Sequence, residues 1–195
     1  MTHTERKAAL RSRALARRLA KGAEACARDS RALCALIAAS DAFLQADCLL
    51  LYIPTRGEFD LTPLADEAAR RGIPVGYPRV EENGLMTYRA VQDRAVLLPG
   101  AFGIPAPSAD APEVLPTERT LLLIPALLGD TDGYRIGYGG GYFDRFLPTF
   151  PGVAVLVLPA DEVVPCLPIE ENDIPVPYLV TPRGWYRDGG QNDTM

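Results

Sequence analysis

Apolar runs separated by helical patterns extend over most of this 195-residue chain. Short runs rich in Leu, Val and Ile, bounded by Gly, Pro or charged residues, are typical of buried strands. We identify them at residues 47–53, 73–78, 85–91, 120–128, 153–158 and 178–180, with a further short segment at 96–98. The run at 85–91 can pair antiparallel. Strands alternating with helices favour an α/β fold, here a single three-layer α/β/α domain with a mostly parallel, Rossmann-like central sheet and a helical N-terminus.

Two helices are expected before the first strand. The first covers residues 4–27 and begins at Thr4, which has the side chain of an N-cap. Lys7 and Arg11 lie four residues apart on one face of it, and another face carries the stripe expected to pack inward, namely Ala8, Leu15 and Leu19. The second helix covers residues 30–45 and is expected to bury Leu33, Ile37 and Leu44.

A third helix, at residues 61–71, ends at Gly72. With the strands at 47–53 and 73–78 it forms one βαβ unit, right-handed by default. Ligands of open parallel sheets bind outside the carboxyl ends of the strands, so the loop at 54–58 is a candidate site wall. Glu58 is its notable side chain, although a loop glutamate can equally be a solvated surface acid. Residues 102–107 predict a stiff, exposed turn, followed by a surface loop to residue 118.

The stretch GYRIGYGGGYFDR at residues 133–145 is the strongest chemical signal in the chain. We expect it to connect the strand at 120–128 to a helix that begins at Gly141 and is stopped by Pro148. Glycines let backbone N–H groups approach phosphate oxygens, and a helix N-terminus adds partial positive charge. Arg135 could clamp a phosphate and Asp144 could bind Mg²⁺. The stretch has no Gly-Lys-Ser/Thr, and Tyr142 replaces the last glycine of Gly-x-Gly-x-x-Gly, so a plain tight turn is the alternative.

Composition limits the chemistry further. The 48% hydrophobic and 23% charged residues are those of an ordinary globular protein. His3 is the only histidine, which excludes Ser-His-Asp and Cys-His hydrolases and histidine-rich metal centres. The four cysteines show no Cys-x-x-Cys spacing and indicate reduced, mostly buried thiols. Without a membrane-length apolar run or a signal peptide, we expect a soluble cytoplasmic protein, one domain over 1–195 with disordered tails at about 1–3 and 186–195.

Charge is distributed unevenly along the chain. Its net charge is −5, but residues 1–31 hold nine Lys and Arg against three acids. A basic helix can be a solvated face, can bind nucleic acid, or can place one or two cations over a small phosphate ligand. Because this helix lacks interleaved aromatics and the rest of the chain is acidic, we favour the solvated face over nucleic acid and expect no nucleic-acid or membrane partner.

These residues together resemble the 5-formyltetrahydrofolate cyclo-ligase (5,10-methenyltetrahydrofolate synthetase) family over nearly the whole chain. The most specific match to the family is the glycine stretch together with Pro125 and Asp130. Four weaker matches agree with the family in order and spacing: Lys7-Ala8-Ala9-Leu10-Arg11, residues 52–58, Gly103-Ile104-Pro105 with Pro107, and Glu171-Asn172-Asp173. The resemblance implies an α/β enzyme that uses ATP and Mg²⁺ to close 5-formyltetrahydrofolate to 5,10-methenyltetrahydrofolate, releasing ADP and phosphate. It implies small-molecule partners, a reduced folate and ATP, and a monomer or weak dimer.

The resemblance also implies residue roles. The catalytic residues would be Arg135 and Tyr142. ATP would be bound by Lys7, Arg11, Arg135, Ile136, Gly137, Tyr138, Gly139, Gly140, Gly141, Tyr142 and Phe143. The folate would contact Ile53, Glu58, Phe102, Tyr138 and Tyr142, and the metal would be held by Asp144 and Asp173. Alternatives remain: Lys7 and Arg11 as surface cations, Asp173 as a turn former, and Phe102 as simple core.

Four positions depart from the family pattern. Ala126 and Gly129 replace a usual Gly and Phe, Ala106 stands where Glu or Gln is frequent, and Pro177 where Asp is frequent. They leave open a non-catalytic relative that binds folate or nucleotide.

Overall fold

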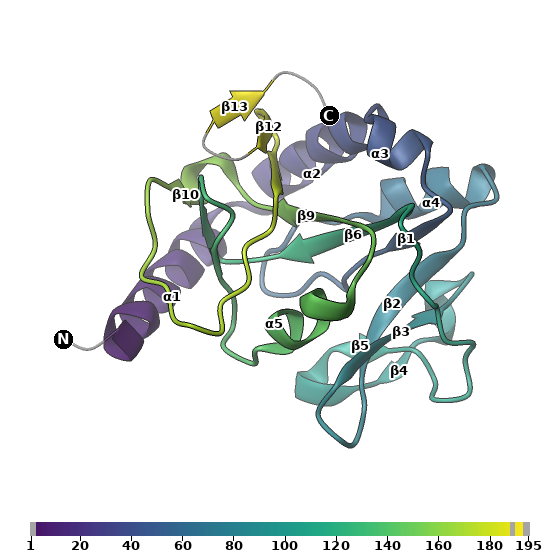
Figure 1. The fold of residues 1–195 in the computed structure, drawn as a ribbon. Helices are drawn as coiled ribbons and strands as arrows, with labels where there is room; N and C mark the ends of the chain where they lie inside the picture. Colours follow the sequence, from purple (N-terminus) through teal and green to yellow (C-terminus); the bar gives the residue numbers. More distant parts are fainter. Residues whose placement is uncertain (1–2, 188–189, 193–195) are drawn as a thin grey trace.

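A central eight-stranded sheet organises the molecule (Figure 1). The structure, a computed structural model, describes residues 3–187 and 190–192. The strand order is β13-β12-β11-β9-β6-β1-β2-β3, and the five strands from β11 to β2 pair in parallel. Their bounds are β1 Cys48–Leu50, β2 Val75–Val80, β6 Thr120–Pro125, β9 Val153–Val157 and β11 Tyr178–Thr181. The expected mostly parallel sheet is confirmed.

Antiparallel strands close both edges of this sheet. β3 (Met86–Ala90) pairs with β2, as the apolar run at 85–91 allowed. At the other edge β12 (Gly184–Arg187) pairs with β11, and β13 (Gly190–Asn192) pairs with β12. The prediction of disorder from residue 186 is therefore wrong for the residues in these two strands, and the predicted strand at 178–180 is not the last strand of the chain. Residues 1–2, 188–189 and 193–195 lie outside the described part.

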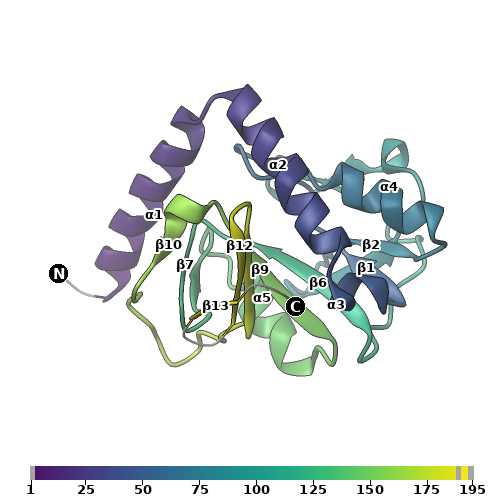
Figure 2. The ribbon, with the colours of Figure 1, turned by 90° about the horizontal axis from the view of Figure 1, so that it is seen from above.

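Helices cover both faces of the sheet, which confirms three layers (Figure 2). Alternate residues of a strand point to opposite faces. Accordingly Leu49, Leu121 and Leu123 pack in one core cluster with residues of α2 (Ala23–Ala38) and α4 (Thr62–Arg70). Leu50 and Leu122 pack on the other face, against α5 (Tyr142–Phe146) and the 3₁₀ turn η3 (Leu147–Thr149).

The two N-terminal helices break at a different place from the one predicted. α1 spans His3–Ala20, starting one residue before the expected cap, and α2 begins at Ala23, because Gly22 adopts extended backbone between them. Ser40 caps the separate short helix α3 (Asp41–Leu44) by accepting from the Phe43 N–H. This turn buries Phe43, and Leu44, expected in the core, is 48% exposed.

The inward face of α1 is also different, because it carries charge. Lys7, Ala14 and Arg18 are buried, whereas Leu19, expected to pack inward, is 60% exposed. Lys7, Ala14 and Arg18 are spaced by seven and four residues, so they lie on one side of the helix. Three of the basic side chains of residues 1–31 make ion pairs with carboxylates of other segments (Lys7, Arg17 and Arg18). The basic helix is therefore neither a fully solvated face nor a continuous cationic surface.

A small second sheet, in the order β10-β7-β8, carries the glycine loop. The apolar run at 120–128 ends its central strand at Pro125 and continues as β7 (Leu128–Asp130), which turns back into β8 (Arg135–Ile136). β10 (Val163–Val164) follows the 3₁₀ turn η4 (Ala160–Glu162). The glycine loop thus follows β8, not the central strand as predicted.

The segment between β3 and β6 forms a separate small hairpin. Its elements are the 3₁₀ turns η1 (Arg94–Val96) and η2 (Ala101–Gly103) and the paired strands β4 (Leu98–Pro99) and β5 (Pro105–Ala106). The turn expected at 102–107 is exposed at Phe102 but buried at Ala106 and Pro107.

Candidate functional site

The glycine loop between β8 and α5 lies against a cation of α1. The Arg11 Nε–H donates to the Gly137 carbonyl over 2.8 Å. Gly139 has a φ of +96°, which favours glycine, and a Cβ there would make an ordinary van der Waals contact of 3.4 Å with the Arg11 guanidinium. Gly141 also has positive φ (+65°) and precedes α5, which has only five residues. The expected helix-terminal charge is therefore that of a single turn, and the loop depends on its amides and on the surrounding cations.

Arg135 is the most buried cation beside this loop. Its side chain is 6% exposed, and its two terminal nitrogens donate to the Ile174 carbonyl (2.6 Å) and to Asp144 Oδ1 (2.7 Å). Asp144 Oδ1 also accepts from the Ile174 N–H at 3.3 Å. Burial lowers the pKa of Arg135, and the charges of Asp144 and Asp173 oppose that effect. A guanidinium this basic stays protonated, so Arg135 presents a fixed positive charge.

Lys7 ties α1 to the segment that carries Asp173. Its Nζ donates to Asp173 Oδ2 (2.5 Å) and Glu170 Oε2 (3.0 Å). Burial alone would lower the pKa of Lys7, but hydrogen bonds and charge from these two carboxylates raise it. Lys7 is buried, so the structure does not support a free surface cation. Asp173 Oδ2 also accepts from the Glu170 N–H at 2.7 Å, so Asp173 shapes the turn as well as facing Lys7.

Asp130 braces the site from beneath, a role that the sequence analysis did not assign. It is 1% exposed; Oδ1 accepts from the N–H groups of Tyr134 (2.9 Å) and Asp132 (3.2 Å), and Oδ2 from Leu167 (2.9 Å). These bonds join the β7–β8 turn to the segment that follows β10. The sequence signal that could have indicated this role is an aspartate that directly follows an apolar run and lies two residues before a turn.

Gly133 completes this support. Its φ is +86°, and a Cβ there would lie 2.1 Å from the Val176 carbonyl oxygen. The Val176 N–H donates to the Gly133 carbonyl at 3.0 Å. Only a glycine lets the strands at 128–136 and the segment at 170–176 approach this closely, which places Asp173 near Arg135.

Aromatic side chains form the outer rim. Tyr138 is 40% exposed, with the Arg56 guanidinium 5.5 Å from its ring centre. Phe102 is 75% exposed and meets the Tyr142 ring edge-on at 6.0 Å, so it is not simple core. Its φ of 58° is uncommon for an aromatic residue. The Arg145 guanidinium lies 5.0 Å from the Tyr142 ring centre.

Two of the residues proposed for ATP binding turn their side chains into the core. Ile136 belongs to the cluster beneath α1, and Phe143 packs against the cluster on the α5 face. Ile136, which is 2% exposed, could contact a ligand only through its backbone, whereas the partly buried Phe143 ring lies 6.0 Å from the Arg135 guanidinium.

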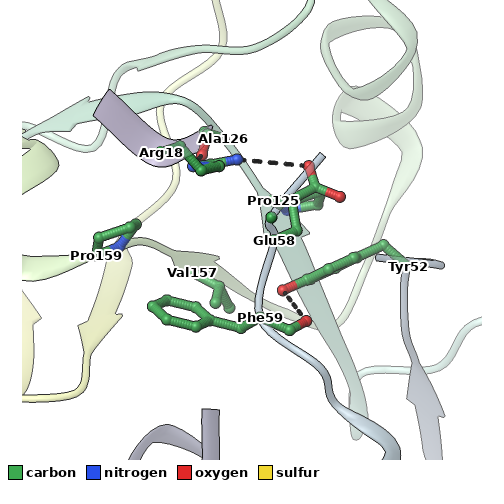
Figure 3. Close-up of a pocket in the computed structure, with 9 residues that line it drawn as sticks. Arg18, Tyr52, Glu58, Phe59, Pro125, Ala126, Val157 and Pro159 are labelled. Carbon is green, nitrogen blue, oxygen red and sulfur yellow. Dashed lines mark hydrogen bonds and ion pairs between the residues drawn. The ribbon is translucent and has the colours of Figure 1, made fainter. Parts of the chain in front are cut away.

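A hollow lies next to the loop at 54–58 (Figure 3). It is partly open to solvent, has a cavity volume of about 10 Å³, and is lined by Arg18, Tyr52, Gly57, Glu58, Phe59, Pro125, Ala126, Val157 and Pro159. Glu58 is 5% exposed in its side chain and Oε2 accepts from the Thr55 N–H at 2.9 Å. Glu58 is therefore not a solvated loop acid. The buried Ile53 lies in the same loop region but is not among the lining residues.

Glu58 gives a prediction about stability. Burial raises the pKa of Glu58, against the opposing effects of the Thr55 N–H, Arg18, Tyr138 and Arg56. A carboxyl whose pKa is higher in the folded state makes the free energy of unfolding fall as pH rises through that pKa. Glu58→Gln, always neutral, should therefore raise Tm by a few degrees at pH 7, and the gain should disappear below about pH 4, the range of an unperturbed glutamate.

The measurement is thermal unfolding of both proteins between pH 4 and 8, with the exposed Glu118→Gln as control. A Glu58→Gln variant less stable than the parent at every pH would contradict the prediction. It would mean that attraction to Arg18 exceeds the cost of burying the carboxylate.

Comparison with known proteins shows the family of this chain. The model of the 5-formyltetrahydrofolate cyclo-ligase family matches residues 3–182. The chain belongs to this family. Its relatives include the 5-formyltetrahydrofolate cyclo-ligase of Escherichia coli (strain K12), 32% identical over 147 residues that cover 71% of this chain and 80% of the relative.

Solved structures related to this cyclo-ligase family member show the same fold. The 5,10-methenyltetrahydrofolate synthetase of Aquifex aeolicus is 33% identical, with a TM-score of 0.83 over 97% of this chain and 96% of its own. The synthetase of Mycoplasma pneumoniae, 18% identical, matches with a TM-score of 0.73 over 90% and 98% of the two chains and supports the fold alone.

The departures from the cyclo-ligase pattern have a structural explanation at one position, Gly129, and nothing in the structure explains Ala126, Ala106 or Pro177. A Cβ at Gly129 would lie 2.4 Å from Leu158 and 2.7 Å from Leu156, so these leucines occupy the space of a larger residue. Ala126 is buried and its carbonyl accepts from Arg18 NH2. Ala106 is buried and Pro177 exposed. Neither Gly129 nor Ala126 touches the glycine loop in the contacts described.

Two further expectations are checked by the described residues. No helix among them is long and apolar enough to cross a membrane. All four cysteines are free thiols: Cys34 and Cys48 are buried, Cys26 is partly exposed and Cys166 exposed. Two of the four are thus buried, not most of them.

Proposed function

We propose that this chain converts 5-formyltetrahydrofolate to 5,10-methenyltetrahydrofolate, with ATP cleaved to ADP and phosphate. The observation that carries the proposal is that Arg11 binds the glycine loop at Gly137 while Arg135 and Lys7 bind the carboxylates of Asp144 and Asp173, in a member of the cyclo-ligase family. These cations come from two elements far apart in sequence, α1 and β8. Phosphoryl transfer depends mainly on positioning and positive charge, which this set supplies without a histidine.

In the proposed reaction, the formyl oxygen attacks the γ-phosphorus of ATP and the bond to the ADP oxygen breaks. N10 of the folate then attacks the activated formyl carbon, the ring closes, and phosphate leaves with the formyl oxygen. Arg135 would stabilise the charge on the transferred phosphoryl group, while amides of residues 137–142 bind the triphosphate. Tyr142, held between Phe102 and Arg145, would shape the side of the loop that faces the folate.

The residues present fit a magnesium ion brought in with ATP. Every hydrogen bond described for Asp144 uses Oδ1, and every one for Asp173 uses Oδ2, which leaves the second oxygen of each carboxylate for a metal. No group of three or more candidate metal ligands occurs in the described part of the chain. This agrees with Mg²⁺, which is commonly held by one or two carboxylates, water and substrate phosphates. When bound, it would neutralise phosphate charge.

The folate would lie across the aromatic rim, with its pterin directed to the hollow beside Glu58. The carboxylate suits the amino and N–H donors of that ring. Tyr138 and Tyr142 offer ring surfaces on the loop itself, and Phe102 approaches from the β4–β5 hairpin. One loop would thus contact both substrates and bring the formyl oxygen to the phosphate.

The proposal is tested by mixing the purified chain with 5-formyltetrahydrofolate, ATP and Mg²⁺. We expect the near-ultraviolet absorbance of the methenyl product to rise, with one ADP released per product. Omitting ATP, or adding excess chelator, should abolish the rise. A folded protein that binds both ligands by calorimetry but releases no ADP would instead be a non-catalytic relative.

A further inference from the structure

The side chain of Arg18, on the inward face of α1, is unexplained by the phosphate site. It is 3% exposed, and NH2 donates to the Ala126 carbonyl. NH1 lies 3.7 Å from Glu58 Oε1, which is within ion-pair distance but too far for a hydrogen bond, and it has no hydrogen-bond partner among residues 3–187 and 190–192. A buried guanidinium N–H without an acceptor is costly, so this nitrogen is a candidate donor to a bound ligand.

The surroundings hold this arginine in place. Gly57, with φ of +76°, lies beneath its stem, because a Cβ there would be 3.3 Å from Arg18 Cγ. Figure 3 shows Arg18 and Glu58 pointing toward each other beside Pro125, with Pro159, Val157 and Phe59 around the hollow. The hollow thus combines apolar side chains with a charged donor, Arg18, and a carboxylate, Glu58, that lie side by side.

A donor next to a carboxylate is complementary to a ligand edge that carries N–H groups next to a carbonyl oxygen. A pterin has such an edge: the 2-amino group, N3–H and the 4-oxo oxygen in adjacent positions. Glu58 can accept from the first two, and a guanidinium N–H can donate to the third. A carboxylate alone would bind the N–H groups but would not distinguish a 4-oxo oxygen from another group at the neighbouring position.

We propose that Arg18 is a specificity-determining residue, whose NH1 donates to the 4-oxo oxygen of the pterin while Glu58 binds the neighbouring N–H groups. This inference rests on the proposed function, because it takes a reduced folate as the ligand. On this proposal, α1 contributes to the recognition of the folate through Arg18 and to the binding of phosphate through Lys7 and Arg11.

The test compares 5-formyltetrahydrofolate with its counterpart in which a 4-amino group replaces the 4-oxo group. Dissociation constants are measured by calorimetry on the full chain and on Arg18→Met, Arg18→Gln and the control Arg17→Met. Arg17 also anchors α1, through a two-bond pair with the buried Glu162, but lies away from the hollow lining. Steady-state KM values for folate and ATP are measured in parallel.

The parent chain should prefer the 4-oxo ligand by about 10-fold or more, the range of one hydrogen bond to a charged group. Arg18→Met should reduce this ratio severalfold, leaving the part that comes from N3–H, which the 4-amino ring lacks and Glu58 would bind, and should raise KM for folate but not for ATP. Arg18→Gln, which keeps a donor, should retain more of the preference. Arg17→Met should keep the ratio of the parent. If Arg18→Met does not fold, the ratio in Arg18→Gln decides, and a value equal to that of the parent overturns the proposal.

An unchanged ratio in Arg18→Met, with KM for ATP raised as much as KM for folate, would also overturn it, because Arg18 would then only hold α1. Failure of the proposed function is distinguishable. A parent chain that forms no methenyl product can still show the 4-oxo preference in binding, and the ratio then tests Arg18 separately.

Discussion

Arg135→Ala is expected to lower kcat by about 10³-fold, the range seen when a phosphate-stabilising arginine or an oxyanion donor is removed. Arg135 presents the most buried positive charge beside the glycine loop and is fixed by Ile174 and Asp144 on two sides. Alanine removes the charge from the place where the transferred phosphoryl group would lie. The measurement is the rate of methenyl product formation at saturating ATP and folate.

Two variants separate this effect from a general disturbance of the loop. Arg145→Ala removes an exposed arginine from the adjacent turn, where it donates to the Gly140 carbonyl, and should reduce the rate by less than about 10-fold. Arg135→Lys keeps the charge but cannot donate in two fixed directions, so its loss of rate should lie between those of Arg135→Ala and Arg145→Ala. Equal losses in Arg135→Ala and Arg145→Ala would show that Arg135 only supports the loop.

The central fold was accessible from the sequence because its strands are continuous apolar runs. A strand buried on both faces needs apolar residues at successive positions, and Leu121, Leu122, Leu123 and Ile124 show that pattern directly. The antiparallel strand β3 was also found. The antiparallel strand β12 on the other side of the sheet was not, since Gly184–Arg187 is short and mixes glycine, aromatic and charged residues.

The inward face of α1 could not be read from hydrophobic periodicity. The periodic rule assumes that a buried stripe is apolar, and here the stripe contains Lys7 and Arg18 because the helix packs over carboxylates and carbonyls. Leu19 lies on the outer side as a result. The rule of hydrophobic periodicity fails where the buried face of a helix contributes side chains to a polar site, because the function of the site then outweighs apolar packing.

The candidate site was accessible in part for a different reason. Glycines, an arginine and a carboxylate close together in sequence signal a phosphate loop locally, and the structure brings Arg135 and Asp144 into contact. Long-range partners were available only through the family resemblance: Lys7 and Asp173 are 166 residues apart. Arg18 was missed, because neither its position in a basic helix nor its neighbours along the chain indicate burial beside Glu58.

Asp144→Asn is expected to leave a folded protein that needs at least about 10-fold more Mg²⁺ for half-maximal activity, since Mg²⁺ is held by few protein ligands and each carboxylate counts. The asparagine carbonyl can still accept from Arg135 and the Ile174 N–H, so the frame around Oδ1 is preserved. What is lost is the negative charge and the second oxygen. The variant therefore separates the support of Arg135 from the proposed binding of metal.

The experiment titrates Mg²⁺ at fixed ATP and follows product formation, with Mn²⁺ binding in the presence of ATP measured by electron paramagnetic resonance. Asp132→Asn, an exposed aspartate of the β7–β8 turn, is the matched control and should keep the Mg²⁺ dependence of the parent. If Asp144→Asn also keeps it, Asp144 only orients Arg135. The metal would then depend on Asp173, the other proposed metal ligand, which lies near Arg135 and Lys7. In that case Asp173→Asn, and not Asp144→Asn, should raise the Mg²⁺ requirement.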